Sequence, residues 1–170
     1  MQKLSKLIGL TTAIYILISV FIWNTDGHEV AITVHSNIQA RLCYSFFHVS
    51  CFHALLNAWC LLSIIFIHNI SPSRLCLAYA IAVCAPDIVL SETPTIGLSA
   101  LCFALLGIIS LQVRDRLYFN ICIALYIGVA LLSPGVNAWL HLYAYLTGVS
   151  LALMIYPIPR HIPHMPSCKK

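Results

Sequence analysis

The sequence predicts an all-α membrane protein with six transmembrane helices and both termini in the cytoplasm. Its 170 residues are 61% hydrophobic and only 8% charged, whereas a soluble domain carries roughly 25% charged residues. The apolar residues form long unbroken runs, which favour helices of about 20 residues over the alternating strands of a membrane β-barrel. This composition argues against a cytosolic enzyme, a disordered protein and a nucleic-acid binder.

Six apolar runs define the predicted helices. Two of them have only about 16 residues, which a helix bundle tolerates. The runs are 7–23, 46–67, 75–90, 97–113, 117–132 and 136–156.

We expect one membrane domain over residues 1–170, the length of about one domain. Lys3 and Lys6 precede the first run, but no small-residue cleavage site follows it, so we expect a retained helix rather than a signal peptide. A long first loop, about residues 24–45, is expected to lie partly in the membrane interface outside the cell, because loops of this length are usually functional or semi-structured. Residues 157–170 form a short cytoplasmic tail.

The orientation follows from the basic residues, which favour the cytoplasmic side. With the N-terminus inside, eight basic residues lie inside and only Arg41 lies outside. We therefore expect a multi-pass protein of the cell (inner) membrane. The eight are Lys3, Lys6, Arg74, Arg114, Arg116, Arg160, Lys169 and Lys170.

Eight cysteines are present, mostly within the apolar runs, with no CxxC pair and no metal-finger spacing. Cysteine in such a setting behaves as a small hydrophobic residue. We therefore expect neither a disulfide framework nor a metal site.

Polar side chains inside spans are costly, which makes them candidates for function. They occur in three runs that all cross from outside to inside: His48, His53 and Asn57 in the second, Ser99 in the fourth and His141 in the sixth. The depth of each polar residue in the membrane follows from the number of residues between it and the inner end of its run. By this count His53, Ser99 and His141 lie at the same depth, about 8 Å below the outer surface. Asn57 is one turn deeper, and its side chain leans outward to the same level.

Small residues indicate which helices touch, because small-xxx-small patterns let membrane helices approach closely. Such residues flank both Ser99 and His141, so we expect these two helices to be neighbours. A serine beside an imidazole at equal depth is the arrangement for nucleophilic catalysis. The small residues are Ala100, Ala104 and Gly107 in one run and Ala144, Gly148 and Ala152 in the other.

Each feature also has a structural interpretation. A single serine in a span usually bonds back to its own helix, a single histidine is often a structural hydrogen-bonding group, and the His53 and Asn57 pair can join helices. Their common depth favours a shared site.

Three motifs in these runs resemble those of the rhomboid family of intramembrane serine proteases. His48, His53 and Asn57, with Arg41-Leu42 before them, are similar to the family's HxxxxHxxxN pattern. Gly97-Leu98-Ser99-Ala100 is similar to GxSG, and His141 to Gly148 is similar to HxxGxxxG. Ala100 and Ala144 each replace a glycine of the family pattern, and both are small enough for close packing.

The resemblance implies a minimal six-helix rhomboid-like bundle that hydrolyses peptide bonds within or near a substrate's transmembrane segment. Ser99 would be the nucleophile and His141 the general base, without a carboxylate. Phe103 would pack on the His141 ring. His53, Asn57 and the backbone N–H of Ser99 would stabilise the oxyanion. His48 is expected to brace the loop or helix end, and Gly97 to line the site.

The expected partners are single-pass or multi-pass membrane proteins and the lipid bilayer, with no nucleic acid, metal or cofactor. The site would open to the extracytoplasmic side, where water reaches it. Two alternatives stay open: a catalytically inactive rhomboid-like protein that binds membrane clients, and a transporter or metal-handling protein that uses His48, His53 and His141.

Overall fold

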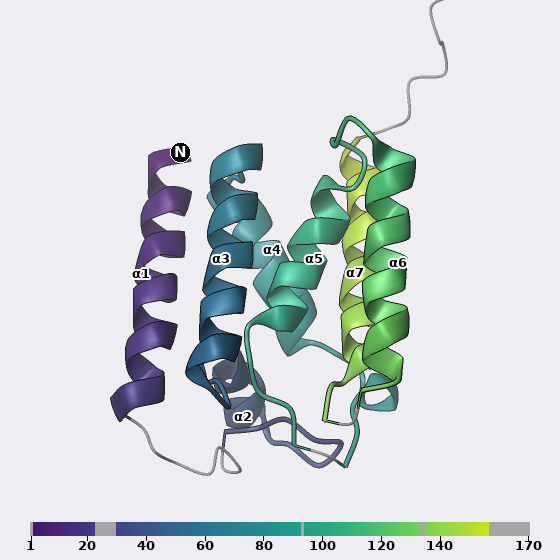
Figure 1. Cartoon of the computed structure of the whole chain (residues 1–170). Coiled ribbons are helices and arrows are strands. Elements are labelled where there is room, and N and C mark those ends of the chain that lie inside the picture. The colour runs from purple at the N-terminus through teal and green to yellow at the C-terminus, as the bar shows by residue number, and fades with distance from the viewer. Residues whose placement is uncertain (1, 23–29, 93, 134, 157–170) are drawn as a thin grey trace, which may run out of the picture.

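Helices make up most of the chain in the computed structural model, which describes residues 2–22, 30–92, 94–133 and 135–156 (Figure 1). Within these residues the β pairing is limited to one bridge between Ile32 and Thr95. The predicted all-helical class is confirmed. The helices are α1 (Gln2–Ile22), α2 (Ile38–Cys43), α3 (Cys51–His68), α4 (Pro72–Val83), α5 (Ser99–Ile109), α6 (Arg116–Leu131) and α7 (Ala138–Ile155), with 3-10 turns η1 (Tyr44–Phe46) and η2 (Asp87–Val89).

Six of these helices correspond to the six predicted apolar runs. Three of them, α1, α3 and α7, are long and apolar enough to cross a membrane, whereas α4, α5 and α6 are shorter apolar helices. The count of six spans therefore stays a prediction.

Two predicted boundaries were wrong for local reasons. The helix in the second run begins at Cys51 rather than at residue 46. The Ser50 side chain caps this helix, α3, by accepting a hydrogen bond from the N–H of His53 at 3.2 Å. His48 therefore precedes the helix. The third run ends its helix at Val83, and Pro86 then leads into the separate turn η2.

The first loop is partly helical where the structure describes it. Asn37 caps α2 by accepting from the N–H of Ala40 at 2.9 Å. The acidic residues of this loop, Asp26 and Glu29, lie outside the described residues, as does the predicted tail 157–170.

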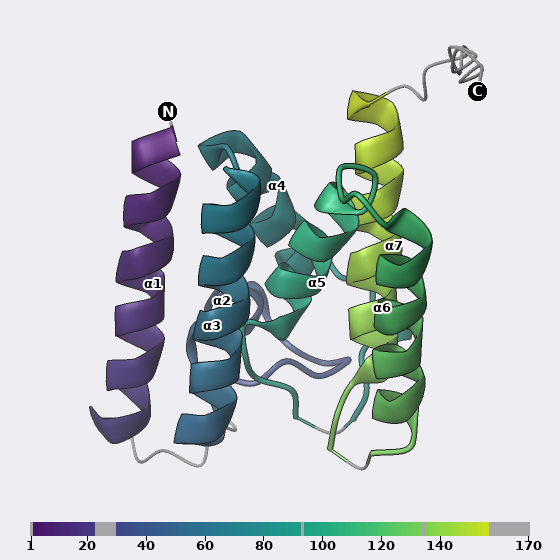
Figure 2. The same cartoon turned by 45° about the horizontal axis from the view of Figure 1, so that its top comes forward.

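The short helix α5 occupies the centre of the bundle, with α3, α4 and α7 around it, whereas α6 packs at the edge against α7 (Figures 1 and 2). Nine of the 11 residues of α5 are buried. Its N-terminal end lies inside the bundle, and the chain from η2 rises from the lower end to reach it. A helix that begins at this depth carries its first residue, Ser99, into the interior.

The closest approach in the core joins α5 and α7. A Cβ atom added to Gly107 would collide with the backbone of Tyr145, and one added to Gly148 would collide with the carbonyl of Ala104. Ala144 is fully buried on the same helix as Gly148. The predicted contact between these two helices, through small residues, is confirmed.

Candidate active site

Ser99 is the first residue of α5, and the chain before it is held by three backbone contacts. Thr95 forms two hydrogen bonds with Ile32, at 2.9 and 3.0 Å, and the N–H of Gly97 donates to the carbonyl of Tyr44 at 3.0 Å. Gly97 has a φ of 125°, which favours glycine. This turn positions Ser99, whose side chain is partly exposed.

His141 comes from the first turn of α7. Asn137 caps this helix by accepting from the N–H of Leu140 at 3.0 Å. The His141 ring is 5% exposed, and its Nε2 lies 2.8 Å from Ser99 Oγ. This distance suits proton transfer between the two side chains.

Phe103, one turn after Ser99, stacks on the His141 ring. The ring centroids are 4.5 Å apart and the planes differ by 17°. The other ring nitrogen of His141, Nδ1, is buried and has no hydrogen-bond partner among the described residues. Stacking, rather than a carboxylate, therefore fixes the orientation of this imidazole.

His53 and Asn57 extend the site along α3. The His53 ring packs against Gly97, where an added Cβ would lie 2.6 Å from His53 Cε1. The Asn57 side chain donates through its Nδ2 to the carbonyl of His53, one turn earlier on α3, at 2.9 Å. One hydrogen of the Asn57 amide is thus used within its own helix, and the second is left for another acceptor.

His48 contacts the turn before the serine rather than the serine itself. Its Nε2 accepts from the N–H of Leu98 at 3.3 Å, and its ring lies 5.0 Å from that of His53. Burial, with a smaller effect of His53, lowers the pKa of His48 to about 3. A neutral imidazole is needed to accept this hydrogen bond, so the low pKa keeps the brace intact.

Arg41, which the sequence singled out only for its charge and its place before the motif of the second run, and Tyr126 make contacts that the sequence did not predict. Arg41 pairs with Asp87 and donates to the carbonyl of Ala85, so it ties α2 to the chain between α4 and η2. Tyr126 of α6 approaches Phe103, with ring centroids 5.5 Å apart. The opposite charges of Arg41 and Asp87, both in segments on the outer side, were a signal for their contact. Nothing in the sequence distinguished Tyr126 from other membrane tyrosines.

A hollow of about 250 Å³ lies between segments that lead into Ser99 and His141, although neither of these residues lines it. The segments that line it are at the lower end of the bundle in Figure 1. It is formed by the chain before α5 and by the connection from α6 to α7, and Ser91, Ser133 and Asn137 give it a polar lining. The hollow is large enough to admit water.

No group of three metal-ligating side chains converges in the part of the chain that the structure describes. His48 and His53 adjoin each other, whereas His141 faces Ser99. The arrangement fits a serine and histidine pair better than a metal centre.

The fold and site define a helical membrane-type bundle with a serine and a histidine in contact at its core. The sequence matches the family described as "Rhomboid domain" over residues 35–158. The chain therefore belongs to the rhomboid family, whose members are generally intramembrane serine proteases. No curated protein and no solved structure matches the chain.

Proposed function

We propose that this chain is an intramembrane serine endopeptidase that cleaves transmembrane segments of membrane proteins through Ser99 and His141. The observation that carries the proposal is the 2.8 Å separation of Ser99 Oγ from His141 Nε2. Membership of the rhomboid family supports the same reaction.

In the proposed mechanism, Ser99 Oγ attacks the scissile carbonyl while His141 Nε2 takes the hydroxyl proton. The imidazolium then gives this proton to the leaving amine, and an acyl-enzyme forms. Water attacks the acyl group, with His141 again as the base, and the second product leaves. The stacked ring of Phe103 keeps Nε2 directed at the serine throughout.

Three donors are proposed to stabilise the oxyanion: the backbone N–H of Ser99, the second amide hydrogen of Asn57, and His53. The N–H of Ser99 is at the N-terminus of α5, where backbone donors are unused by the helix. Each such donor is worth about 3 kcal/mol in the transition state. The packing of His53 on Gly97 supports this placement, because it holds the imidazole against the turn that carries Ser99.

We propose that the chain crosses the membrane six times as one domain over residues 1–170, with both ends in the cytoplasm. The short helices α4 and α5 are tolerable because they pack within the bundle. The lower end in Figure 1, with the hollow, then faces outward and admits water. The inner membrane is the proposed location, and loop 24–45 and tail 157–170 lie on opposite sides.

The substrate helix must unwind locally before its peptide bond reaches Ser99. We therefore propose that substrates carry small or helix-breaking residues near the cleavage site, where unwinding costs least. The polar lining of the hollow can bind the backbone groups that unwinding exposes.

The test is labelling by a serine-reactive fluorophosphonate, together with cleavage of a transmembrane reporter substrate. The unmodified chain should label, and Ser99→Ala and His141→Ala should abolish both signals. Ser110→Ala is the matched control, because Ser110 lies at the other end of the same core helix, is fully buried and should leave both signals unchanged.

Folded protein that neither labels nor cleaves in detergent and in bilayers would overturn the proposal. It would favour instead a rhomboid-like protein that binds membrane clients without cutting them.

A further inference from the structure

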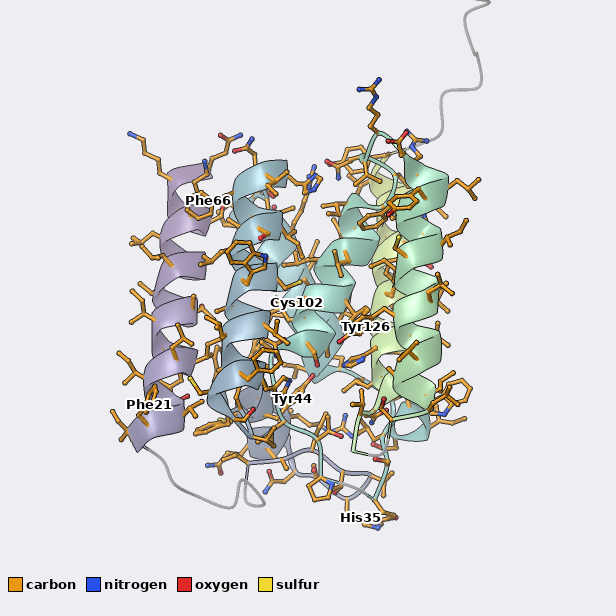
Figure 3. The ribbon with its side chains drawn as sticks, viewed as in Figure 1. Phe21, His35, Tyr44, Phe66, Cys102 and Tyr126 are labelled. Atoms are coloured by element: carbon orange, nitrogen blue, oxygen red, sulfur yellow. The ribbon has the colours of Figure 1, made fainter. Side chains whose placement is uncertain are left out.

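The ring of Phe103, which stacks on His141, has a second aromatic neighbour that belongs to α6. The centroid of the Tyr126 ring lies 5.5 Å from that of Phe103, and the two planes are tilted by 42°. In Figure 3 Tyr126 lies on the side of α6 that faces α5. Phe103 therefore contacts both the imidazole of the proposed base and an aromatic ring from a third helix.

Tyr126 covers Phe103 at the edge of the bundle. Phe103 is 6% exposed, whereas Tyr126 is 60% exposed. Within α6, whose residues are all described, only Ile127 and Ala130 are buried. Most of the Tyr126 side chain thus faces outward, so its removal costs α6 little packing but uncovers the ring that stacks on the imidazole.

A hydrogen bond between α6 and α7 fixes the height at which Tyr126 lies. The hydroxyl of Tyr145 donates to Oδ1 of Asn120, and Nδ2 of the same amide donates to the carbonyl of Arg116 within α6. Tyr145 follows His141 by four residues, so both lie on one face of α7. The helix that carries the proposed base therefore also sets the register of α6, and with it the place of Tyr126.

We propose that Tyr126 is a positioning residue whose ring holds Phe103 against the His141 imidazole. This role rests on the proposed function, in which His141 is the base. The imidazole depends on packing because its Nδ1 has no hydrogen-bond partner among the described residues. Without the Tyr126 ring, Phe103 has room to turn away from the imidazole, and a base that is less well oriented takes the serine proton more slowly.

The first measurement is the rate constant for fluorophosphonate labelling of Ser99 in bilayers. Tyr126→Ala should slow labelling by about 2- to 5-fold, within the range for the loss of one aromatic contact. Tyr126→Phe keeps the ring and should restore the rate. Tyr118→Ala is the matched control, because Tyr118 is also an exposed tyrosine of α6, about two turns earlier. It should keep the original rate.

A double mutant tests whether Tyr126 acts through Phe103. In a chain that already carries Phe103→Ala, Tyr126→Ala should slow labelling no further, because the ring that it holds is absent. For a transmembrane reporter substrate, Tyr126→Ala should lower kcat and leave KM unchanged. A change in KM alone, with unchanged labelling, would overturn the proposal and assign Tyr126 to substrate binding instead.

The second measurement reads the imidazole directly and does not require activity. In protein that carries isotope-labelled histidine, the NMR signal of the His141 ring is identified by its loss in His141→Ala. This signal should shift in Tyr126→Ala and in Phe103→Ala, and it should stay in place in Tyr118→Ala.

Three results would each overturn the proposal: an unchanged labelling rate in Tyr126→Ala, an additive loss in the double mutant with Phe103→Ala, or an unmoved His141 signal in Tyr126→Ala. If the unmodified chain does not label at all, the proposed function is wrong. The His141 signal then still decides whether Tyr126 orients the imidazole.

Discussion

His141 meets Ser99 through one ring nitrogen, and its other nitrogen finds no acceptor among the described residues. In a triad that second nitrogen would donate to a carboxylate, which holds the imidazole in place. Here the aromatic ring of Phe103 covers the imidazole instead. The orientation of the base therefore depends on packing rather than on a hydrogen bond.

Replacing Phe103 should test this dependence. Stacked aromatic pairs contribute about 0.5–1.5 kcal/mol beyond their buried area, so Phe103→Ala should slow fluorophosphonate labelling of Ser99 by about 2- to 12-fold. Phe103→Tyr keeps a ring and should stay near the original rate. The rate constant for fluorophosphonate labelling is measured for both variants. Equal rates for Phe103→Ala and the unmodified chain would show that the ring does not orient His141.

His48 should make the fold sensitive to acid. In the unfolded chain its imidazole binds a proton near its ordinary pKa of about 6.5, whereas burial lowers the pKa of His48 in the folded chain to about 3. Between these values the unfolded state binds more protons, so the free energy of unfolding falls as the pH is lowered through this window.

The expected loss is at most about 1.4 kcal/mol per pH unit. His48→Gln cannot be protonated and can still accept from the N–H of Leu98. It should lose less stability than the unmodified chain between pH 7 and pH 5, as measured by thermal unfolding at both pH values. His53 and His141 are present in both chains, so an identical pH dependence would exclude His48 as the source.

For single residues, the sequence predicts the position of a side chain when that position follows from helical spacing. Ser99 and His141 could be brought together by counting along their runs, because depth and face fix where they lie, whereas the place of Phe103 came from the resemblance to the rhomboid family. The hydrogen bond of the Asn57 amide to its own helix could not be predicted, because it depends on a side-chain torsion.

The contact between α5 and α7 determines whether Ser99 and His141 meet, since each helix contributes one of the pair. Gly148→Ala should destabilise the bundle by about 1–3 kcal/mol, because the added methyl collides with the Ala104 carbonyl. Labelling of Ser99 should fall with it. Gly128→Ala, on α6, is the matched control, because a methyl there meets nothing within 4 Å. Denaturation midpoints compare the two, and equal midpoints would contradict the close approach.

The ion pair of Arg41 and Asp87 joins α2 to the chain that leads toward α5. Its Arg41 side chain is 18% exposed, whereas the pair of His35 and Glu92 on the same end is 81% and 78% exposed. Partly buried charged hydrogen bonds contribute about 1.5–3 kcal/mol, and exposed pairs about 0–1 kcal/mol.

A double-mutant cycle of Arg41→Gln with Asp87→Asn should therefore give a coupling energy of about 1–2 kcal/mol. The same cycle on His35 and Glu92 should give close to zero. Denaturant unfolding measures both cycles. A coupling for Arg41 and Asp87 as small as that of the exposed pair would show that α2 is held by packing alone.

The positions of the six helices in the apolar runs could be predicted because such runs are a strong signal, but their ends could not. The helix in the third run stops at Val83 although residues 85–90 are still largely apolar, since Pro86 interrupts the helix there. Conversely, α2 forms within the predicted loop because Asn37 caps it. Hydropathy reports which residues avoid water, whereas caps and prolines determine where a helix begins and ends.

For the whole molecule, the arrangement of the ends supports the proposed orientation. The start of α1 and the chain from α5 to α6, which carries Arg114, lie at the upper end of Figure 1, whereas His35 lies at the lower end in Figure 3. Cytoplasmic loops carry an excess of Lys and Arg. If the upper end is cytoplasmic, the hollow at the lower end opens to the outside, where water is abundant.

A cysteine-accessibility experiment tests that orientation in intact cells. In a chain whose natural cysteines are replaced by alanine, His35→Cys should react with a membrane-impermeant maleimide added outside, whereas Lys3→Cys and Arg114→Cys should react only after the cells are opened. The expectation follows because His35 is exposed on the side of the hollow, and the two basic residues lie in segments that the charge rule assigns to the cytoplasm. Reaction of Arg114→Cys, but not His35→Cys, in intact cells would invert the topology and place Ser99 toward the cytoplasm. Water would then have to reach the serine from the opposite side of the membrane.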